Sequence, residues 1–467
     1  MIGGGITGLS AAYEASRLGA DVVLLEASPR LGGKVTTEVV DGFLVELGPD
    51  SFVGPKQSVL DLAGELGIGD AVVSSRPEGQ GARVWWDGAL HPLPEGLMLM
   101  VPAKLTPLMR SSLLSWRGKV RVFGDLFVPR GNGEDETLES FVVRRLGREV
   151  LERIAEPLIA GIHAAEPATM SLRASFPRFL EMERRHRSLI VAARRAAHRR
   201  PEGPHRSHFV SFRDGMGTLA AALSRALHDV DVRTSTSVAR ISVRRDGYRL
   251  LTEAGAIDAD RVVLAVPART ASELLEPLDS RAAASVRQIR QVSTATVTLG
   301  YRAADIPPLA GSGFVVPSST NRKVMGVSFL SNKWDGRAPD DDHVLIRAFV
   351  GGVHGRRLAT ASDEEILTEV ERELDLMLGI RAAPTLVRVA SWDGGLHQYT
   401  TGHIQRVEAA EARLAESHPG LVLAGAAFHG IGLNECVSSG RRAGLHATGQ
   451  RSSSLREGHE LAWRMGG

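Results

Sequence analysis

The chain opens with Met1-Ile2-Gly3-Gly4-Gly5-Ile6-Thr7-Gly8, and this stretch decides the fold. Its glycines have the spacing G-x-G-x-x-G, in which the first permits a tight turn and the second lets a pyrophosphate approach the backbone. The third lets a helix pack closely on a strand. A helical pattern follows as far as Gly19, and then a short apolar run ends at Glu26. The order of turn, helix, strand and acid predicts a Rossmann-type dinucleotide-binding unit.

Glu26 lies 18 residues beyond Gly8, at the end of the predicted strand. A carboxylate there accepts hydrogen bonds from ribose hydroxyls and repels a 2′-phosphate, so an NADP site is disfavoured. Only Met1 and Ile2 precede the turn, where about five residues normally form a strand. We therefore expect a longer native N-terminus, and a stability cost if this central strand is short.

The composition is typical of a soluble globular protein, with 43% hydrophobic and 24% charged residues. At roughly 150 residues per domain, 467 residues predict about three domains. The net charge of +2 disfavours a nucleic-acid partner. Neither a membrane span nor a signal peptide is predicted, and the single cysteine, Cys436, allows no internal disulfide and no cysteine-based metal site. We expect a cytoplasmic protein without a metal.

Periodicity predicts the remaining elements. Residues 90–130, which contain five prolines, are predicted to be helical rather than part of a sheet, and residues 136–160 to form two helices. Strands are predicted at residues 230–232, 238–243, 248–252, 261–266, 295–301, 313–316, 324–329, 344–350 and 421–423, and helices at 363–378 and 438–450. Residues 184–206 are rich in arginine, which fits a solvated helix face and linker, or contact with an anionic membrane or substrate.

Three further segments extend the dinucleotide motif. Arg30-Leu31-Gly32-Gly33 follows Glu26, Gly48-Pro49-Asp50-Ser51 comes next, and a glycine-rich turn from Gly425 to Gly432 precedes a helix with Val437. Together they resemble the FAD enzymes of the amine oxidase superfamily. In that superfamily the last segment packs on the flavin, with the helix N-terminus near the isoalloxazine.

The resemblance narrows with residues 394–403, Gly-Gly-Leu-His-Gln-Tyr-Thr-Thr-Gly-His, and residues 425–437, Gly-Ala-Ala-Phe-His-Gly-Ile-Gly-Leu-Asn-Glu-Cys-Val. Residues 90–94 and 156–163, which include Gly161, match as well. The chain thereby resembles the flavin-dependent porphyrinogen oxidases of haem biosynthesis, from Gly3 to Gly444. It departs from them at His397, where the family usually has proline, and at His163 and Ala165, which puts fine substrate choice in doubt.

The resemblance implies FAD as cofactor and repeated hydride transfer from a porphyrinogen, either protoporphyrinogen IX or coproporphyrinogen III, to the flavin. Molecular oxygen is the expected acceptor, and no side chain is predicted to act as a catalytic base. The residues expected to bind the cofactor are Gly3, Gly5, Gly8, Glu26, Arg30, Gly32, Gly33, Gly48, Pro49, Asp50, Ser51, Val238, Trp392, Gly425, Gly432 and Val437. Cys436 is expected to be a buried, inert thiol near the flavin.

The substrate carries propionates on an apolar ring, so a basic rim is expected. Arg83 and Lys56 match basic positions in the family, and solvated surface charge is the alternative for each. Gly161, Phe329 and Phe349 are the other expected substrate-binding residues, although ordinary core packing is the alternative for the phenylalanines.

The predicted fold class is α/β. A Rossmann-type FAD-binding domain is assembled from residues 1–82, 205–280 and 386–450, and a mixed-sheet substrate domain spans residues 281–385. Residues 83–204 form a helical, membrane-facing region and part of the substrate domain, and residues 451–467 a tail. Peripheral contact with the inner face of the cell membrane and a homodimer are both compatible with this plan. The alternatives are another enzyme of the superfamily, such as an amine oxidase or carotenoid desaturase, or a non-catalytic binding protein like the GDP-dissociation inhibitors.

Overall fold

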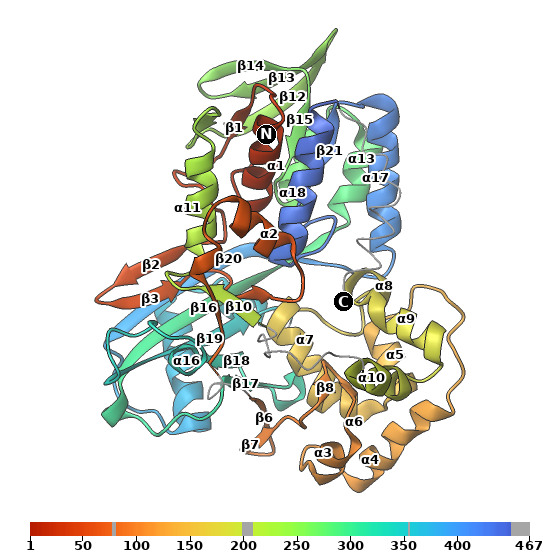
Figure 1. Ribbon diagram of the computed structural model, residues 1–467, viewed down its shortest axis with the longest axis vertical. Helices are drawn as coiled ribbons and strands as arrows, with labels where there is room; N and C mark the ends of the chain where they lie inside the picture. The colour runs from red at the N-terminus through yellow and green to blue at the C-terminus, as the bar shows by residue number, and fades with distance from the viewer. Residues whose placement is uncertain (77–80, 199–208, 354, 450–467) are drawn as a thin grey trace.

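The computed structural model describes residues 1–76, 81–198, 209–353 and 355–449, which form a mixed α/β structure. Three groups of elements make it up (Figure 1). The first is a set of short parallel strands with helices α1 (Ile6–Arg17), α11 (Gly217–Ala226) and α18 (Leu433–Ala447), and the second is a seven-stranded mixed sheet with α16 (Asp363–Leu378). The third is a group of short helices, α3 to α10, beside that sheet.

The parallel strands bring together segments that are remote in the sequence. β1 (Val23–Leu25) pairs with β11 (Asp231–Arg233), and β15 (Val262–Leu264) pairs with β21 (Leu421–Leu423). Ile2 lies between the two pairs: its N–H donates to the carbonyl of Val263 at 2.9 Å, and the N–H of Gly3 donates to the carbonyl of Leu25 at 2.8 Å. Residues 1–3 therefore occupy the central position that was expected for a first strand.

Helix α1 (Ile6–Arg17) packs closely on α18 (Leu433–Ala447), near opposite ends of the chain. Two glycines of α18 permit this approach. A Cβ at Gly440 would lie 2.2 Å from the carbonyl oxygen of Thr7, and one at Gly444 would lie 2.4 Å from that of Ala11. No larger residue fits at these positions unless the helices separate.

The seven-stranded sheet has the order β20-β16-β19-β18-β17-β6-β7. These strands are β20 (Leu386–Gln398), β16 (Arg290–Arg302), β19 (His343–Gly351), β18 (Val324–Phe329), β17 (Gly313–Val315), β6 (Ala82–Trp86) and β7 (Ala89–Pro92). Helix α16 (Asp363–Leu378) covers one face with Ile366, Val370 and Leu374, all fully buried. Ser362 caps the helix by accepting from the N–H of Glu365, and Gly379 ends it at a φ of +70°.

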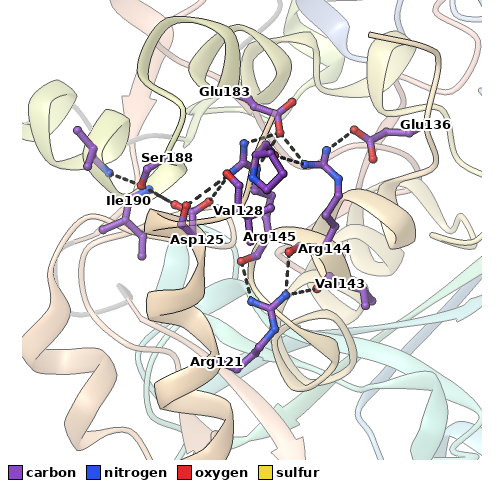
Figure 2. A network of polar contacts seen from close by, with 12 residues as sticks. Arg121, Asp125, Val128, Glu136, Val143, Arg144, Arg145, Glu183, Ser188 and Ile190 are labelled. Atoms are coloured by element: carbon purple, nitrogen blue, oxygen red, sulfur yellow. Dashed lines mark hydrogen bonds and ion pairs between the residues drawn. The ribbon is translucent and has the colours of Figure 1, made fainter. Parts of the chain in front are cut away.

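The helical group is tied together by a buried network of charged side chains (Figure 2). Arg145, which is fully buried, donates to Glu183 from Nε at 2.8 Å and from Nη2 at 2.5 Å, and to Asp125 from Nη1 at 3.3 Å. Asp125 also accepts from the hydroxyl of Ser188 at 2.6 Å and from the N–H of Ile190 at 3.1 Å. The network thus joins α5, α9 and the first turn of α10. The complete helical group consists of α3 (Leu105–Arg110), α4 (Trp116–Phe123), η2 (Gly124–Leu126), α5 (Leu138–Arg145), α6 (Arg148–Val150), η3 (Leu151–Ala155), α7 (Glu156–His163), α8 (Leu172–Ser175), α9 (Pro177–His186) and α10 (Leu189–His198).

Two- and three-stranded sheets and further helices complete the described part of the chain. The strands are β2 (Thr37–Val40), β3 (Phe43–Glu46), β4 (Phe52–Val53), β5 (Val72–Ser74), β8 (Leu97–Met98), β9 (Val101–Pro102), β10 (Phe209–Phe212), β12 (Val238–Arg244), β13 (Gly247–Thr252) and β14 (Gly255–Ala259). The helices are α2 (Ser58–Glu65), η1 (Gly69–Ala71), α11 (Gly217–Ala226), α12 (Ala268–Leu275), α13 (Ser280–Arg287), η4 (Ala303–Asp305), η5 (Ser318–Thr320), α14 (Leu330–Lys333), α15 (Arg356–Ala359) and α17 (His403–Ser417).

The predicted strands of the second half and the helix at 363–378 are confirmed, within a few residues at most ends. The prediction that residues 90–130 contain no sheet was wrong, because β7 joins the large sheet and β8 pairs with β9 before the first helix begins at Leu105. Proline is tolerated there because β7 is an edge strand. β20 was missed, since Gly394 and Gly395 hide the strand pattern in its second half. The tail at 451–467 and part of the arginine-rich segment lie outside the described residues.

Candidate cofactor and substrate site

The glycine turn before α1 leaves an open space at one position. Gly3 and Gly8 are required by the protein itself, because a Cβ at Gly3 would lie 2.4 Å from the carbonyl oxygen of Ala265 and one at Gly8 would lie 1.8 Å from that of Gly3. At Gly5 a Cβ would meet nothing within 4 Å, and its φ of −70° suits any residue. Gly5 precedes a helix N-terminus with no side-chain cap and no acid in its first turn, which is a suitable place for an anion.

The second glycine pair lies directly against this turn. The N–H of Gly32 donates to the carbonyl of Gly4 at 2.8 Å, and a Cβ at Gly33 would lie 3.1 Å from the Cα of Gly5. Arg30 supports the loop by donating to the carbonyl of Gly33 at 2.9 Å. The two glycine motifs predicted for the cofactor are therefore neighbours in space.

Glu26 places its carboxylate at the same turn. One oxygen accepts from the N–H of Gly4 at 2.6 Å, and the other accepts from the N–H of Ser28 at 2.8 Å. Val238 lies behind the turn, in an apolar cluster with Ile2 and Leu25. Glu26 thus lies at the glycine turn with both carboxylate oxygens accepting backbone N–H groups, whereas Val238 contributes an apolar side chain.

The Gly48–Ser51 segment connects this half to the seven-stranded sheet. Gly48 packs on the backbone of Lys34, and its carbonyl accepts from Arg347 at 2.6 Å. Trp392 lies beside it, because its indole N–H donates to the carbonyl of Leu47 at 3.1 Å. Asp50 pairs with Lys333 at 2.9 Å; burial alone would raise the pKa of Asp50, but Lys333 and Arg347 hold it well below its usual range.

The C-terminal segment lies against the start of helix α1. Gly425 has a φ of +104° and packs on Thr7, its N–H donating to Ser439 at 2.9 Å. Gly432 is the N-cap of α18, and Val437 is fully buried one turn later. Burial raises the pKa of the Cys436 thiol to about 11, which suits an unreactive cysteine.

Tyr399 is a residue to which the sequence assigned no role. Its hydroxyl donates to the carbonyl of Ala426 at 3.0 Å and accepts from the N–H of Gly430 at 2.6 Å. Its ring stacks on His403, with centroids 3.7 Å apart. Tyr399 therefore shapes the glycine-rich turn before α18, and its place in the matching segment at 394–403 was the available signal.

Lys34 was also missed, although a basic residue directly after a double glycine was a usable signal. Burial lowers the pKa of its amine, and a Cβ at Gly395 would lie 3.5 Å from its Cε. No ion pair joins Lys34 to another residue within the described chain. A half-buried cation that has no carboxylate partner among the described residues fits an anionic or carbonyl group of a bound cofactor.

The predicted substrate residues fall into two sets. Lys56 forms an ion pair with Glu435 at 2.5 Å, at the start of α18. Burial, with the nearby charge of Lys56, lowers the pKa of His163 to about 4, which places Lys56 close to the end of α7. Gly161 lies on the same helix, is exposed, and would meet only Val315 with a Cβ.

Arg83 and Phe329 lie elsewhere. Side chains alternate along a strand, so Arg83 shares the face of Trp85, which packs in the α16 cluster, whereas Val84 packs with the helical group. Gly161 touches Val315 on the helical side, so the structure does not bring Arg83 to Gly161.

Phe329 and Phe349 point to opposite faces of the large sheet. Phe329 is 2% exposed in the α16 cluster, which favours the core alternative. Phe349 is partly exposed and shares a face with Arg347, whose guanidinium lies 5.2 Å from its ring centroid. Because Arg347 contacts Gly48, Phe349 faces the side where Trp392 and the cofactor residues lie.

These contacts join both ends of the chain around one site, and a family model described as flavin containing amine oxidoreductase matches residues 6–444. The chain belongs to the flavin-containing amine oxidoreductase family. FAD is the cofactor of this family, and the open space at Gly5, the uncapped helix N-terminus and the half-buried Lys34 fit such a group.

Among relatives of this flavin oxidoreductase, coproporphyrinogen III oxidase of Bacillus subtilis (strain 168) is 32% identical, covering 95% of this chain and 96% of that protein. Protoporphyrinogen oxidase of Bos taurus is 33% identical, covering 97% and 99%. A protein from Exiguobacterium sp. 255-15, known from its crystal structure, is 33% identical to this chain in sequence, and the two structures superpose with a TM-score of 0.87. The match covers 96% of this chain and 98% of that chain.

Proposed function

We propose that this chain is an FAD-dependent oxidase that converts a porphyrinogen, protoporphyrinogen IX or coproporphyrinogen III, to the porphyrin, with molecular oxygen as acceptor. The similarity to porphyrinogen oxidases over nearly the whole of both chains carries the proposal. When bound, FAD supplies the hydride acceptor. The chain's own residues bind, orient and shield the cofactor and the substrate.

The cofactor is held by residues from both ends of the chain in this proposal. Gly3, Gly5, Gly8, Gly32, Gly33 and the α1 N-terminus receive the diphosphate, and Glu26 receives a ribose. Gly48–Ser51, Trp392, Gly425, Gly432 and Val437 surround the flavin, with Tyr399 holding the last turn in place. Residues 1–82, 205–280 and 386–450 then form the FAD-binding domain of Rossmann type, supported by their shared parallel strands. β20 begins the third of these segments and pairs with β16 in the seven-stranded sheet, so it links the FAD-binding domain to the substrate domain.

Steady-state turnover of both porphyrinogens, measured side by side by product fluorescence and oxygen uptake, tests the function. We expect at least one substrate to give fluorescent porphyrin with matching oxygen consumption. A yellow protein that oxidises a primary amine and neither porphyrinogen would support the amine oxidase alternative. A colourless protein that cannot be loaded with FAD would support the binding-protein alternative.

Lys56 is the better placed of the two basic residues proposed to bind a propionate. It lies beside Glu435 and near His163, on the side of Gly161, whereas Arg83 lies on the other face of the sheet. We expect Lys56→Met to raise KM for the better porphyrinogen about tenfold, since a charge-assisted contact contributes about 1.5–3 kcal/mol. Arg83→Gln should have a smaller effect.

The Lys56 variant also leaves Glu435 without its partner, so the test includes Lys56→Met/Glu435→Gln and Lys56→Arg. If Lys56 binds the substrate, KM should be high in Lys56→Met and in Lys56→Met/Glu435→Gln, and Lys56→Arg should partly restore it. Equal KM values for wild type and Lys56→Met, or a larger increase in Arg83→Gln, would contradict the assignment.

The helical group also exposes four apolar side chains within twelve residues of sequence, on α4, on η2 and directly after it: Trp116, Val120, Leu126 and Phe127. Trp116 is 69% exposed and Phe127 is 81% exposed. The basic residues Arg117, Lys119 and Arg130 lie close by in sequence. In the described part of the chain, no helix is long and apolar enough to cross a membrane. We propose that this surface docks on an anionic lipid bilayer, because apolar side chains among cations suit the membrane interface.

Sedimentation with anionic vesicles tests the docking surface. Trp116→Ser/Phe127→Ser should lower the bound fraction several-fold, because two large apolar groups no longer enter the interface. Val39→Ser is a matched control, since Val39 is 72% exposed on β2, away from the helical group. Equal vesicle binding by the wild type and the double variant would contradict the proposal.

A further inference from the structure

A cleft of about 380 Å³ opens where α12, α13, β16, α15 and β20 meet. Its size falls within the range of small-molecule sites, roughly 300–1,000 Å³. None of its lining residues belongs to the proposed cofactor or substrate set. The lining contains four arginines, Arg269, Arg287, Arg290 and Arg356, and a single carboxylate, Asp393.

The floor of this cleft is held in place by a set of hydrogen bonds. Gln291 accepts from the N–H of Arg269 at 3.0 Å and donates to the carbonyl of Gly394 at 2.6 Å. Ser293 donates to Asp393 at 2.7 Å and accepts from the N–H of Gly394 at 3.0 Å. These bonds join α12, β16 and β20, so the arginines project from a connected base.

The positive charge of the cleft is only partly balanced. Arg287 pairs with Glu276 at 2.5 Å, and Arg269 lies 4.0 Å from Glu273, which are both exposed pairs. Within the described residues, neither Arg290 nor Arg356 has a carboxylate within ion-pair distance.

We propose that this cleft binds a small multivalent oxyanion, a compound carrying two or more phosphate or carboxylate groups. Guanidinium groups grip either anion through parallel hydrogen bonds, and Arg290 and Arg356, which have no ion pair among the described residues, match more than one anionic group together with Arg269 and Arg287. The hydroxyl of Thr270 and the apolar side chains of Pro267 and Ile289 line the rest of the cleft. The proposal does not depend on the reaction at the flavin.

Isothermal titration of the FAD-loaded protein with inorganic pyrophosphate, and separately with citrate, at matched ionic strength tests this site. The two probes distinguish a phosphate ligand from a carboxylate ligand. We expect at least one to bind, and Arg290→Gln/Arg356→Gln to weaken that binding by at least about tenfold. Arg302→Gln is the control, since Arg302 is an exposed arginine at the other end of β16 with no carboxylate at ion-pair distance among the described residues.

Binding that is unchanged in the double variant, or weakened equally by Arg302→Gln, would overturn the proposal. The proposal would also be overturned if neither pyrophosphate nor citrate binds at millimolar concentration. FAD content and melting temperature, measured for each variant, establish that the folded holoenzyme is being compared.

Discussion

Gly5→Val is expected to give a folded protein that purifies without its yellow colour. The protein itself leaves room for a side chain at this position and the backbone angles permit one. The proposed pyrophosphate would occupy that room, so valine and cofactor compete for it. We expect FAD affinity to fall about 100-fold or more, measured by titration of the apoprotein with FAD.

Gly64→Val is the matched control for this substitution. A Cβ at Gly64, in α2, also meets nothing within 4 Å, but no cofactor is proposed there. Both apoproteins should melt close to the wild-type temperature. Stoichiometric FAD in Gly5→Val would contradict the proposed position of the diphosphate.

Arg145→Met is expected to destabilise the protein by about 3–5 kcal/mol, because it leaves the buried Asp125 without its cation and Glu183 with Arg144 alone. Arg145 is fully buried between Glu183 and Asp125 (Figure 2). Chemical denaturation followed by circular dichroism measures the change in the free energy of unfolding. Arg148→Met is the control, since the Arg148 side chain is 57% exposed and its pair with Glu139 should contribute about 1 kcal/mol or less.

The same network predicts a dependence on pH. Burial alone would raise the pKa of Glu183, but Arg144 and Arg145 lower it below its ordinary value. A lowered folded-state pKa gives a stabilising contribution that is complete above the ordinary glutamate pKa and is lost as the pH falls toward the folded value. Arg145→Met should therefore differ most from wild type near neutral pH. A difference below about 1 kcal/mol there would show that the network contributes little.

The cofactor half of the fold was predictable from the sequence because its signals are local and steric. Gly3 and Gly8 are glycine because the chain packs against itself there, and Glu26 follows at a spacing set by one helix and one strand. The far-end segment from Gly425 was recognisable by its resemblance to known flavoproteins. Its contact with α1 through Gly440 and Gly444 could have been suspected only from the four-residue spacing of the two glycines.

The substrate half was harder because it depends on register. Whether Arg83 or Val84 faces Gly161 changes with a shift of one residue, and no local pattern fixes that choice. β20 pairs with β16 across almost a hundred residues, and its glycines weaken the strand signal. The Arg145 network likewise joins residues separated by up to 65 positions, which periodicity does not reveal.

Anaerobic mixing of the FAD-loaded protein with coproporphyrinogen III or protoporphyrinogen IX tests the central claim most directly. We predict loss of the visible flavin absorbance with at least one of them, appearance of porphyrin fluorescence when air is admitted, and neither change in Gly5→Val protein. A fully loaded flavoprotein whose absorbance is unchanged by both porphyrinogens would contradict the account.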